Sequence, residues 1–154
     1  MKNKEIYQTP IFAKQADLIL NSYFHWFQKP LIQKTQTRFQ EIFQASFVLL
    51  SHDIQTDPIL NFANHQALKL WEMDWKTFIH TPSRLTAEAP NREERQKFLS
   101  TVQEKGFIEN YSGIRISSSG RRFRIEQAKV WNLIDENSNY AGQAALFDQW
   151  QFLE

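Results

Sequence analysis

The run Ser51-His52-Asp53 holds the three residue types of a hydrolytic triad. In such a triad a histidine takes the proton of a serine nucleophile, and an aspartate orients the histidine. The run follows an apolar segment typical of a β-strand, and consecutive strand residues point to opposite faces of a sheet. The sequence also has no Gly-x-Ser-x-Gly motif, which presents the nucleophile in many hydrolases. We therefore interpret the run as a strand end and a turn, and predict no catalytic residue.

The histidines are the other residues that could bind a metal, since the chain has no cysteine. Zinc sites commonly use ligands spaced a few residues apart on one helix or turn. His25, His52, His65 and His80 contain no pair at i+3 or i+4 spacing. Neither a Gly-rich lysine loop nor a dinucleotide fingerprint is present. The sequence thus predicts no metal site and gives no support for nucleotide chemistry.

Composition narrows the class of protein. The chain has 154 residues, 42% of them hydrophobic and 14% aromatic, which suffices for one domain with large rings in its core. No window approaches the roughly 20 apolar residues that cross a bilayer. A formal net charge of +1 provides no overall field to attract nucleic acid. We expect a cytoplasmic protein with no membrane or nucleic-acid partner.

A helix is predicted near the amino terminus, from Ile11 to Lys29. Thr9 can cap it, and Pro10 suits its first position. This helix carries more large apolar side chains than one buried stripe uses. We predict that it packs on the sheet or forms a homodimer. A shorter, more polar helix is expected from Leu31 to Ala45.

Two strands and a helix follow. Phe47–Leu50 is a compact apolar run that predicts a first strand, and Ile59–Phe62 predicts a second. Asn64 then stands where its side chain can accept hydrogen bonds from the first free amides of a helix ending near Trp71. We interpret Asn64 as a structural cap.

Short helices and one longer helix occupy the middle of the chain. Asp74 can cap a short helix that Pro82 stops. Asn91-Arg-Glu-Glu94 has the offset of a capping box and predicts the start of the longer helix. Gly106 is the expected end of that helix. Three strands are predicted after it, over Phe107–Ser117, Arg121–Leu133 and Tyr140–Phe147.

This order of elements resembles the PAS family over residues 47–148. The resemblance implies an α+β fold, with a PAS-like five-stranded antiparallel sheet that has helices on one face, plus an N-terminal helical extension. The expected boundaries are 1–45 for the extension, 46–148 for the PAS-like domain and 149–154 for a C-terminal tail. We expect no output domain after Asp148, so a signal would leave through a separate output protein or through oligomer assembly.

Several short motifs are similar to the MEKHLA domain, a PAS-like module at the carboxyl end of plant class III homeodomain leucine-zipper proteins and in standalone bacterial proteins. The hexapeptide that names the family is absent, so the standalone bacterial form is the nearer expectation. The resemblance implies sensing or interaction without enzymatic activity, and it leaves the ligand unknown. The motifs are Ser51-His-Asp, Asp57-Pro-Ile, Phe62-Ala-Asn64, Trp71-Glu-Met-Asp-Trp75, Pro82-Ser-Arg84, Tyr111-Ser-Gly-Ile-Arg-Ile-Ser117, Gly120-Arg-Arg-Phe123 and Val130-Trp-Asn-Leu133.

The PAS resemblance also bears on cofactors, which stay unknown from sequence. Flavin photochemistry that bonds a cysteine is excluded, because the chain has no cysteine. Some PAS domains ligate haem through a helical histidine, a role that would fall to His65 or His80. We prefer an ordinary helix or loop position for both residues.

A pocket between helices and sheet is a further implication of the resemblance. It would hold a small organic ligand, although aromatic rings in these positions equally suit a filled core. Arg84 lies in the irregular segment over this pocket, where it either binds ligand or pairs with an acidic side chain. The candidate ligand-binding residues are Trp71, Phe78, Arg84, Phe98, Tyr111, Trp131, Asn132 and Gln143.

Positive charge gathers on the hairpin formed by the later strands. An anion or an acidic partner could bind there, but antiparallel sheets often have one wet face, so we expect these side chains to be solvated. The residues are Arg115, Arg121, Arg122, Arg124 and Lys129.

Two other functions stay open. An NTF2-like pocket enzyme of the isomerase or cyclase type would need an acid such as Glu126 or Asp148 deep in the cavity. A purely structural partner-binding domain would have a filled core.

Overall fold

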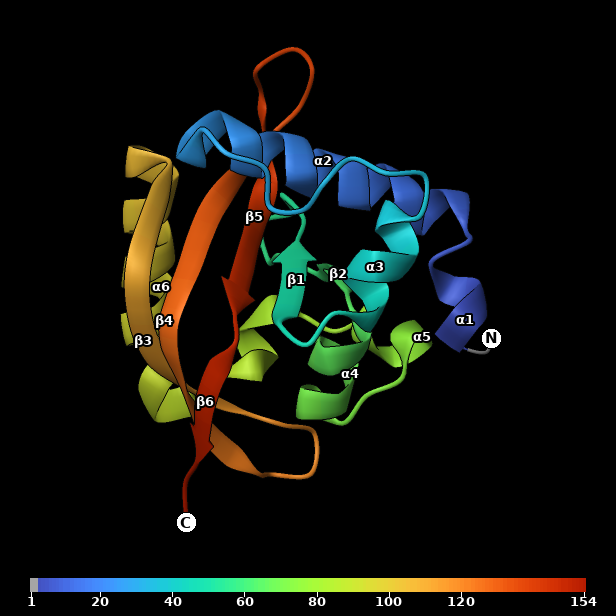
Figure 1. Ribbon diagram of the computed structural model, residues 1–154. Coiled ribbons are helices and arrows are strands. Elements are labelled where there is room, and N and C mark those ends of the chain that lie inside the picture. The colour runs from blue at the N-terminus through green and yellow to red at the C-terminus, as the bar shows by residue number, and fades with distance from the viewer. Residues whose placement is uncertain (1–2) are drawn as a thin grey trace.

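The computed structural model describes residues 3–154, which form one antiparallel sheet flanked by helices (Figure 1). The sheet has six strands in the order β2-β1-β5-β4-β3, and β6 follows β5 along the same edge of β4. The strands are β1 (Val48–His52), β2 (Leu60–Ala63), β3 (Phe107–Ile116), β4 (Arg122–Ile134), β5 (Tyr140–Phe147) and β6 (Gln149–Phe152). The helices are α1 (Asn3–Ile6), α2 (Pro10–Phe27), α3 (Arg38–Gln44), α4 (His65–Trp71), α5 (Trp75–Phe78), the 3₁₀-helix η1 (Ser83–Thr86) and α6 (Ala89–Lys105).

The helices cover both faces of the sheet. In Figure 1, α2 crosses β4 and β5 on one side, while α6 lies against β3 and β4 on the other. Successive side chains of β4 point to opposite faces of the sheet, so this strand contacts both helices. Trp131 packs edge-on against Tyr23 of α2, with ring centroids 5.1 Å apart. The next residue, Asn132, instead donates from Nδ2 to the Gln103 carbonyl of α6 at 3.0 Å.

Helix α2 begins and packs as its sequence predicts. The Thr9 hydroxyl oxygen accepts a hydrogen bond from the Phe12 amide at 3.3 Å, and Pro10 occupies the first turn. Phe12 and Ile19 are fully buried. The indole N–H of Trp26 donates to the Asn132 carbonyl at 2.9 Å, so the predicted packing of this helix on the sheet is confirmed.

The predicted helix over Leu31–Ala45 is shorter in the structure, where α3 begins at Arg38. Two threonine hydroxyls hold the turn before α3 in a non-helical conformation. Thr35 and Thr37 donate to the Glu41 carboxylate at 2.5 and 2.7 Å. Threonine hydroxyls offer the chain an alternative to helical hydrogen bonding, which accounts for the late start.

Three of the four predicted N-terminal helix caps are confirmed, counting that of Thr9. The Asn64 side-chain oxygen accepts from the Ala67 amide at 3.2 Å, and that of Asp74 accepts from the Thr77 amide at 2.7 Å. The capping box at Asn91 is wrong, because α6 already begins at Ala89. Pro90 in the first turn favours this earlier start, since the amide it lacks would have no helical partner there.

Strands β3 and β4 each carry one extra residue where they pair. The register advances by three residues on β3 between Ile108 and Tyr111, and by three on β4 between Ile125 and Ala128. Asn110 and Gln127 have φ values of 60° and 53° at these two β-bulges. Each bulge reverses the alternation of side chains along its strand, which decides which residues reach the space beneath α6.

The expected C-terminal tail is instead strand β6. Gln149–Phe152 pairs with β4 from Phe123 to Glu126. The Arg121 guanidinium lies 3.4 Å from the centre of the Phe152 ring, a cation–π contact that holds the strand at its far end. The sheet therefore gains a sixth strand beyond the five that were predicted.

Candidate functional site

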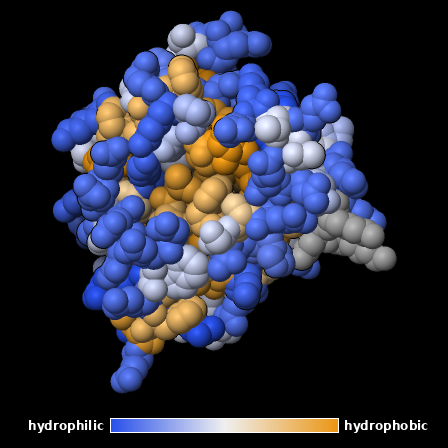
Figure 2. Space-filling view, in the orientation of Figure 1, coloured by the Kyte–Doolittle hydropathy of each residue, from blue (hydrophilic) through white to orange (hydrophobic). Residues whose placement is uncertain are grey.

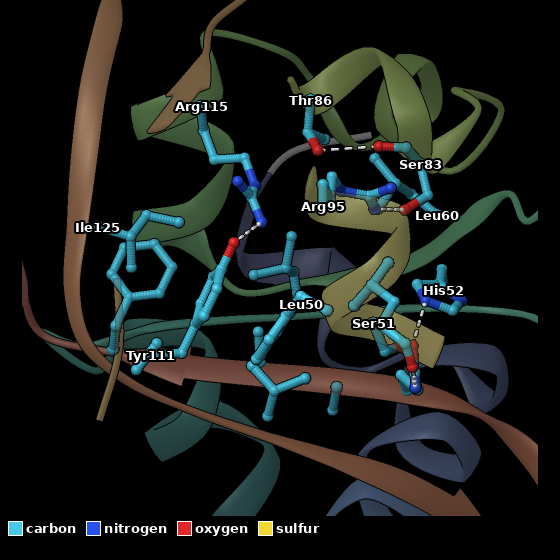
Figure 3. Close-up of a pocket in the computed structure, with 18 of the residues that line it drawn as sticks. Leu50, Ser51, His52, Leu60, Ser83, Thr86, Arg95, Tyr111, Arg115 and Ile125 are labelled. Carbon is cyan, nitrogen blue, oxygen red and sulfur yellow. Dashed lines mark hydrogen bonds between the residues drawn. The ribbon is translucent and has the colours of Figure 1, made fainter. Parts of the chain in front are cut away.

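A partly open cavity of about 60 Å³ lies between the sheet and the helices η1 and α6 (Figure 3). Its walls combine apolar side chains with a few buried polar groups, which is the usual composition of a small-molecule site. The residues that line it are Leu50, Ser51, His52, Leu60, Trp71, Ser83, Thr86, Arg95, Phe98, Leu99, Tyr111, Arg115, Ile125, Ala128, Val130, Gln143, Ala144, Ala145 and Phe147.

Four of the candidate residues from sequence do line this cavity, namely Trp71, Phe98, Tyr111 and Gln143. The ring of Phe98 on α6 stacks on that of Tyr111 on β3, with centroids 3.6 Å apart. Gln143 donates from Nε2 to the Leu99 carbonyl at 2.9 Å, which joins β5 to α6. These side chains therefore form the contact between the two layers as well as the cavity wall.

Three other candidates do not line the cavity. Phe78 of α5 is fully buried. Asn132 contacts α6 and accepts from Gln143 at 3.2 Å. Arg84 pairs with Asp57 at 3.2 Å, and its side chain is 50% exposed. The interpretation of Arg84 as the partner of an acidic side chain is thus confirmed.

Trp131 is placed on the opposite face of the sheet. It packs against α2, with Tyr23 and Phe27 edge-on to its ring. The bulge at Gln127 explains this position. Trp131 lies six positions after the cavity residue Ile125, so both would share one face of a regular strand. The extra residue at the bulge shifts the alternation by one position and turns Trp131 to the other face.

The sequence did not single out Arg95 of α6, and it assigned Arg115 of β3 to the solvated charges. Both arginines line the cavity and are buried, with 8% and 6% of their surface exposed. Arg115 pairs in register with Phe123, and directly opposed residues of an antiparallel pair share a face. Because Phe123 faces the core, this pairing is the signal that would have placed Arg115 there.

The other hairpin charges are neutralised or stacked at the surface. Arg122 pairs with Glu88 at 2.6 Å. Lys129 donates from Nζ to the Tyr23 hydroxyl at 2.8 Å. The expectation of solvation thus fails chiefly at Arg115.

Neutral groups surround the two buried guanidinium groups. Arg95 donates to the Ser83 hydroxyl. Arg115 donates to the Tyr111 hydroxyl at 3.0 Å and to the Ile114 carbonyl at 2.9 Å. Burial, together with the like charge of Arg115, lowers the pKa of Arg95 to about 10. The lowered pKa of Arg95 means that its charged form is destabilised, because a buried charge without a counter-ion is unfavourable.

His52 is buried beside the cavity and has both ring nitrogens engaged. Nδ1 lies 2.9 Å from the Asp53 carbonyl oxygen, and Nε2 lies 3.2 Å from Oε1 of Gln143. Burial lowers the pKa of His52 below its ordinary value, and the positive charge of Arg95 acts in the same direction. Ser51 donates to Asn61 at 2.6 Å rather than to the histidine. The triad residues therefore form no relay, as the sequence argument predicts.

The carboxylates named for an enzymatic alternative are not in the cavity wall. Glu126 is half-buried and Asp148 is exposed. Within residues 3–154, no three His, Asp or Glu side chains gather where they could hold a metal ion. None of the helices in that range is long and apolar enough to span a bilayer.

Comparison of the sequence with protein families matches residues 13–152 to the MEKHLA domain. Homeobox-leucine zipper protein ATHB-14 of Arabidopsis thaliana is 24% identical over 119 residues, which are 76% of this chain and 14% of that protein. HOX10 of Oryza sativa subsp. indica, also a homeobox-leucine zipper protein, is 22% identical over 148 residues, 94% of this chain and 18% of that protein. The chain thus spans a small part of the length of these relatives.

Comparison with solved structures finds the same fold in PAS domains. The PAS domain of a Colwellia psychrerythraea protein superposes with a TM-score of 0.61 at 16% identity, over 77% of this chain and 95% of that one. An RNA-binding light-oxygen-voltage receptor superposes with a TM-score of 0.62 at 16% identity, over 77% of this chain and 35% of that one. The predicted α+β fold with a PAS-like sheet is confirmed.

Proposed function

We propose, from the premise that this chain belongs to the MEKHLA domain family, that it is a non-enzymatic sensor module. Its cavity would hold a small organic ligand, and occupation of the cavity would change how the module contacts its partners. The observation that carries this proposal is the cavity of about 60 Å³ beneath α6, with buried polar side chains in an otherwise apolar wall.

The arrangement of polar groups supports binding rather than catalysis. A general base needs a free nitrogen or oxygen within reach of a substrate proton. The two imidazole nitrogens of His52 face the Asp53 carbonyl and the Gln143 side chain rather than open space, and Ser51 is bonded to Asn61. The NTF2-like alternative also loses support, because neither Glu126 nor Asp148 lines the cavity.

The face that carries α2 supports a role in protein contacts. Figure 2 shows apolar side chains gathered in a hollow near the middle of this face, within a rim of polar side chains. Such patches commonly mark interaction sites. On α2 itself, Phe24 is 52% exposed although the helix packs on the sheet. We include in the proposal a homodimer through this helix, with a separate output protein as a second partner.

Native mass spectrometry of protein purified from its own host tests the sensor proposal. A retained small molecule, released when the protein is denatured, is the expected result. An absorption spectrum of the same sample identifies haem or flavin if either is the cofactor. A bare mass, combined with no rise in Tm across a metabolite library, would contradict the proposal and favour a purely structural partner-binding domain.

A further inference from the structure

Arg95 and Arg115 are buried cations without a buried anion beside them. Neither residue takes part in the ion pairs Asp17–Arg38, Asp57–Arg84, Glu93–Lys97 and Glu88–Arg122. No aspartate or glutamate lines the cavity. Buried charges are normally paired, since an uncompensated charge in the interior is costly. The cavity thus carries two positive charges that the described protein does not neutralise.

The two arginines bring only hydrogen-bond donors to the cavity. A guanidinium has five N–H donors and no acceptor. Figure 3 shows Arg115 reaching the Tyr111 hydroxyl on one side of the cavity and Arg95 beside Ser83 on the other. The Tyr111 hydroxyl accepts from Arg115 and so keeps its own proton to donate. These contacts leave most of the guanidinium N–H groups for an acceptor from outside the protein.

Trp71 provides an independent sign of a missing acceptor. Its ring lines the cavity, and its indole N–H is buried with no hydrogen-bond partner among the described residues. Indole N–H groups in protein interiors usually find an acceptor. The indole N–H of Trp131, on the other face of the sheet, is unpaired as well, so the two unpaired cations are the main indication of an oxygen-bearing anion.

The apolar part of the cavity wall restricts the size and polarity of the rest of that ligand. Leu50, Ile125, Val130 and Phe147 present apolar surface to the cavity. A volume of about 60 Å³ gives room for roughly four to six water-sized groups. A carboxylate with a short hydrocarbon tail fits both limits, whereas a phosphate would leave the apolar wall without a partner.

We infer that the cavity binds a short aliphatic monocarboxylate of two to four carbons, with its carboxylate between Arg95 and Arg115 and its tail against Leu50 and Ile125. The inference rests on the proposed sensor function and specifies the ligand class of the same cavity. Guanidinium groups suit this role because their planar donor pairs match the two oxygens of a carboxylate.

Isothermal titration of the full chain with sodium propanoate at pH 7 tests the inference. Propanamide is the matched probe, since it has nearly the same shape without the charge. We expect saturable binding of propanoate and none of propanamide. The variants R95M and R115M should each weaken binding by roughly 30-fold or more, because each removes one partner of a buried charge contact. R84M is the control that should bind like wild type, since Arg84 lies outside the cavity wall and pairs with Asp57.

The two methionine variants should also fold, because replacing an unpaired buried charge by an apolar side chain of similar length removes its desolvation cost. Their Tm without propanoate should equal or exceed that of wild type. Equal binding of propanamide, unchanged affinity in both variants, or binding of inorganic phosphate alone would overturn the inference. A neutral molecule retained in native mass spectrometry would refute the carboxylate while leaving the sensor proposal intact. Failure of both probes together with a bare native mass would refute both.

Discussion

The side-chain oxygen of Asn64 accepts a hydrogen bond from the Leu49 backbone amide at 3.1 Å, which ties the start of α4 to the middle of β1. The same oxygen caps α4 through Ala67, and the amide nitrogen donates to the carbonyls of Ile42 and Phe47 at 3.1 and 2.8 Å. One fully buried side chain thus joins α3, β1 and α4.

Replacement of Asn64 by alanine should lower the free energy of unfolding by about 2–4 kcal/mol, because it leaves buried backbone groups without partners. Asn64→Asp should be at least as harmful, since it keeps the acceptor but loses both donated bonds and adds a buried charge. Urea denaturation monitored by tryptophan fluorescence measures both. Asp74→Ala is the control, as removal of that exposed cap should cost about 1 kcal/mol.

Gly142 should not tolerate a larger residue. Its φ is +123°, and a Cβ atom there would lie 2.1 Å from the His52 carbonyl oxygen. We expect Gly142→Ala to cost roughly 3 kcal/mol or more, as the close contact adds to about 1–2 kcal/mol of backbone strain. Gly120 has a φ of +91° with open space around it, so Gly120→Ala should show the strain alone. Equal losses of Tm in the two variants would contradict the close contact.

Stability should fall as pH decreases through the range in which His52 would ordinarily titrate. Burial lowers the pKa of His52 in the folded protein, whereas the unfolded chain has an imidazole pKa near 6.5. Below pH 6.5 the unfolded state therefore binds more protons, and the free energy of unfolding decreases with a slope of at most about 1.4 kcal/mol per pH unit.

Urea titrations between pH 7.5 and 5.5 measure this slope. His52→Gln should reduce it, because glutamine keeps a polar side chain but cannot take up a proton. His80→Gln, at an exposed position, should leave it unchanged. A slope that survives in His52→Gln would assign the pH dependence to another group.

The proposed homodimer predicts a twofold mass at micromolar concentration. Sedimentation velocity of wild type should show a dimer, and Phe24→Asp should yield monomer, because a charge in an apolar interface is unfavourable. Ile54→Asp is the control, since this side chain is 61% exposed in the loop between β1 and β2 rather than on α2. A monomeric wild type would remove the dimer from the proposal and leave the separate output protein.

Local signals in the sequence placed most of the elements. The cap side chains of Thr9, Asn64 and Asp74 bond to backbone amides three residues further along the chain. Such a cap depends on the local sequence alone, so it indicates the start of a helix directly. The start of α6 was placed late because Asn91 has a good capping offset, although Pro90 beside it favours an earlier first turn. Strand β6 was missed since its pairing with β4 is a tertiary contact without a local pattern.

The cavity was harder to predict than the fold. Which side of a strand a residue occupies depends on register and on bulges, and neither bulge at Asn110 nor at Gln127 involves a glycine that would mark it. Trp131 was therefore assigned to the cavity, on the wrong side. Arg115 was assigned to solvent although it lies four positions after Tyr111 on β3, where strand alternation alone places both side chains on one face. Arg95 was missed because a helical arginine is normally exposed.

The two cavity arginines belong to different layers, Arg95 to α6 and Arg115 to β3, and these elements pack directly on each other. The two like charges repel each other across the boundary between helix and sheet. An anion between them would reverse the sign of that force and draw α6 toward the sheet. The outer side of α6 carries the exposed pair Glu93 and Lys97. Binding of an anion inside the core would in this way move the surface side chains of α6. A second protein could detect that movement without contacting the ligand.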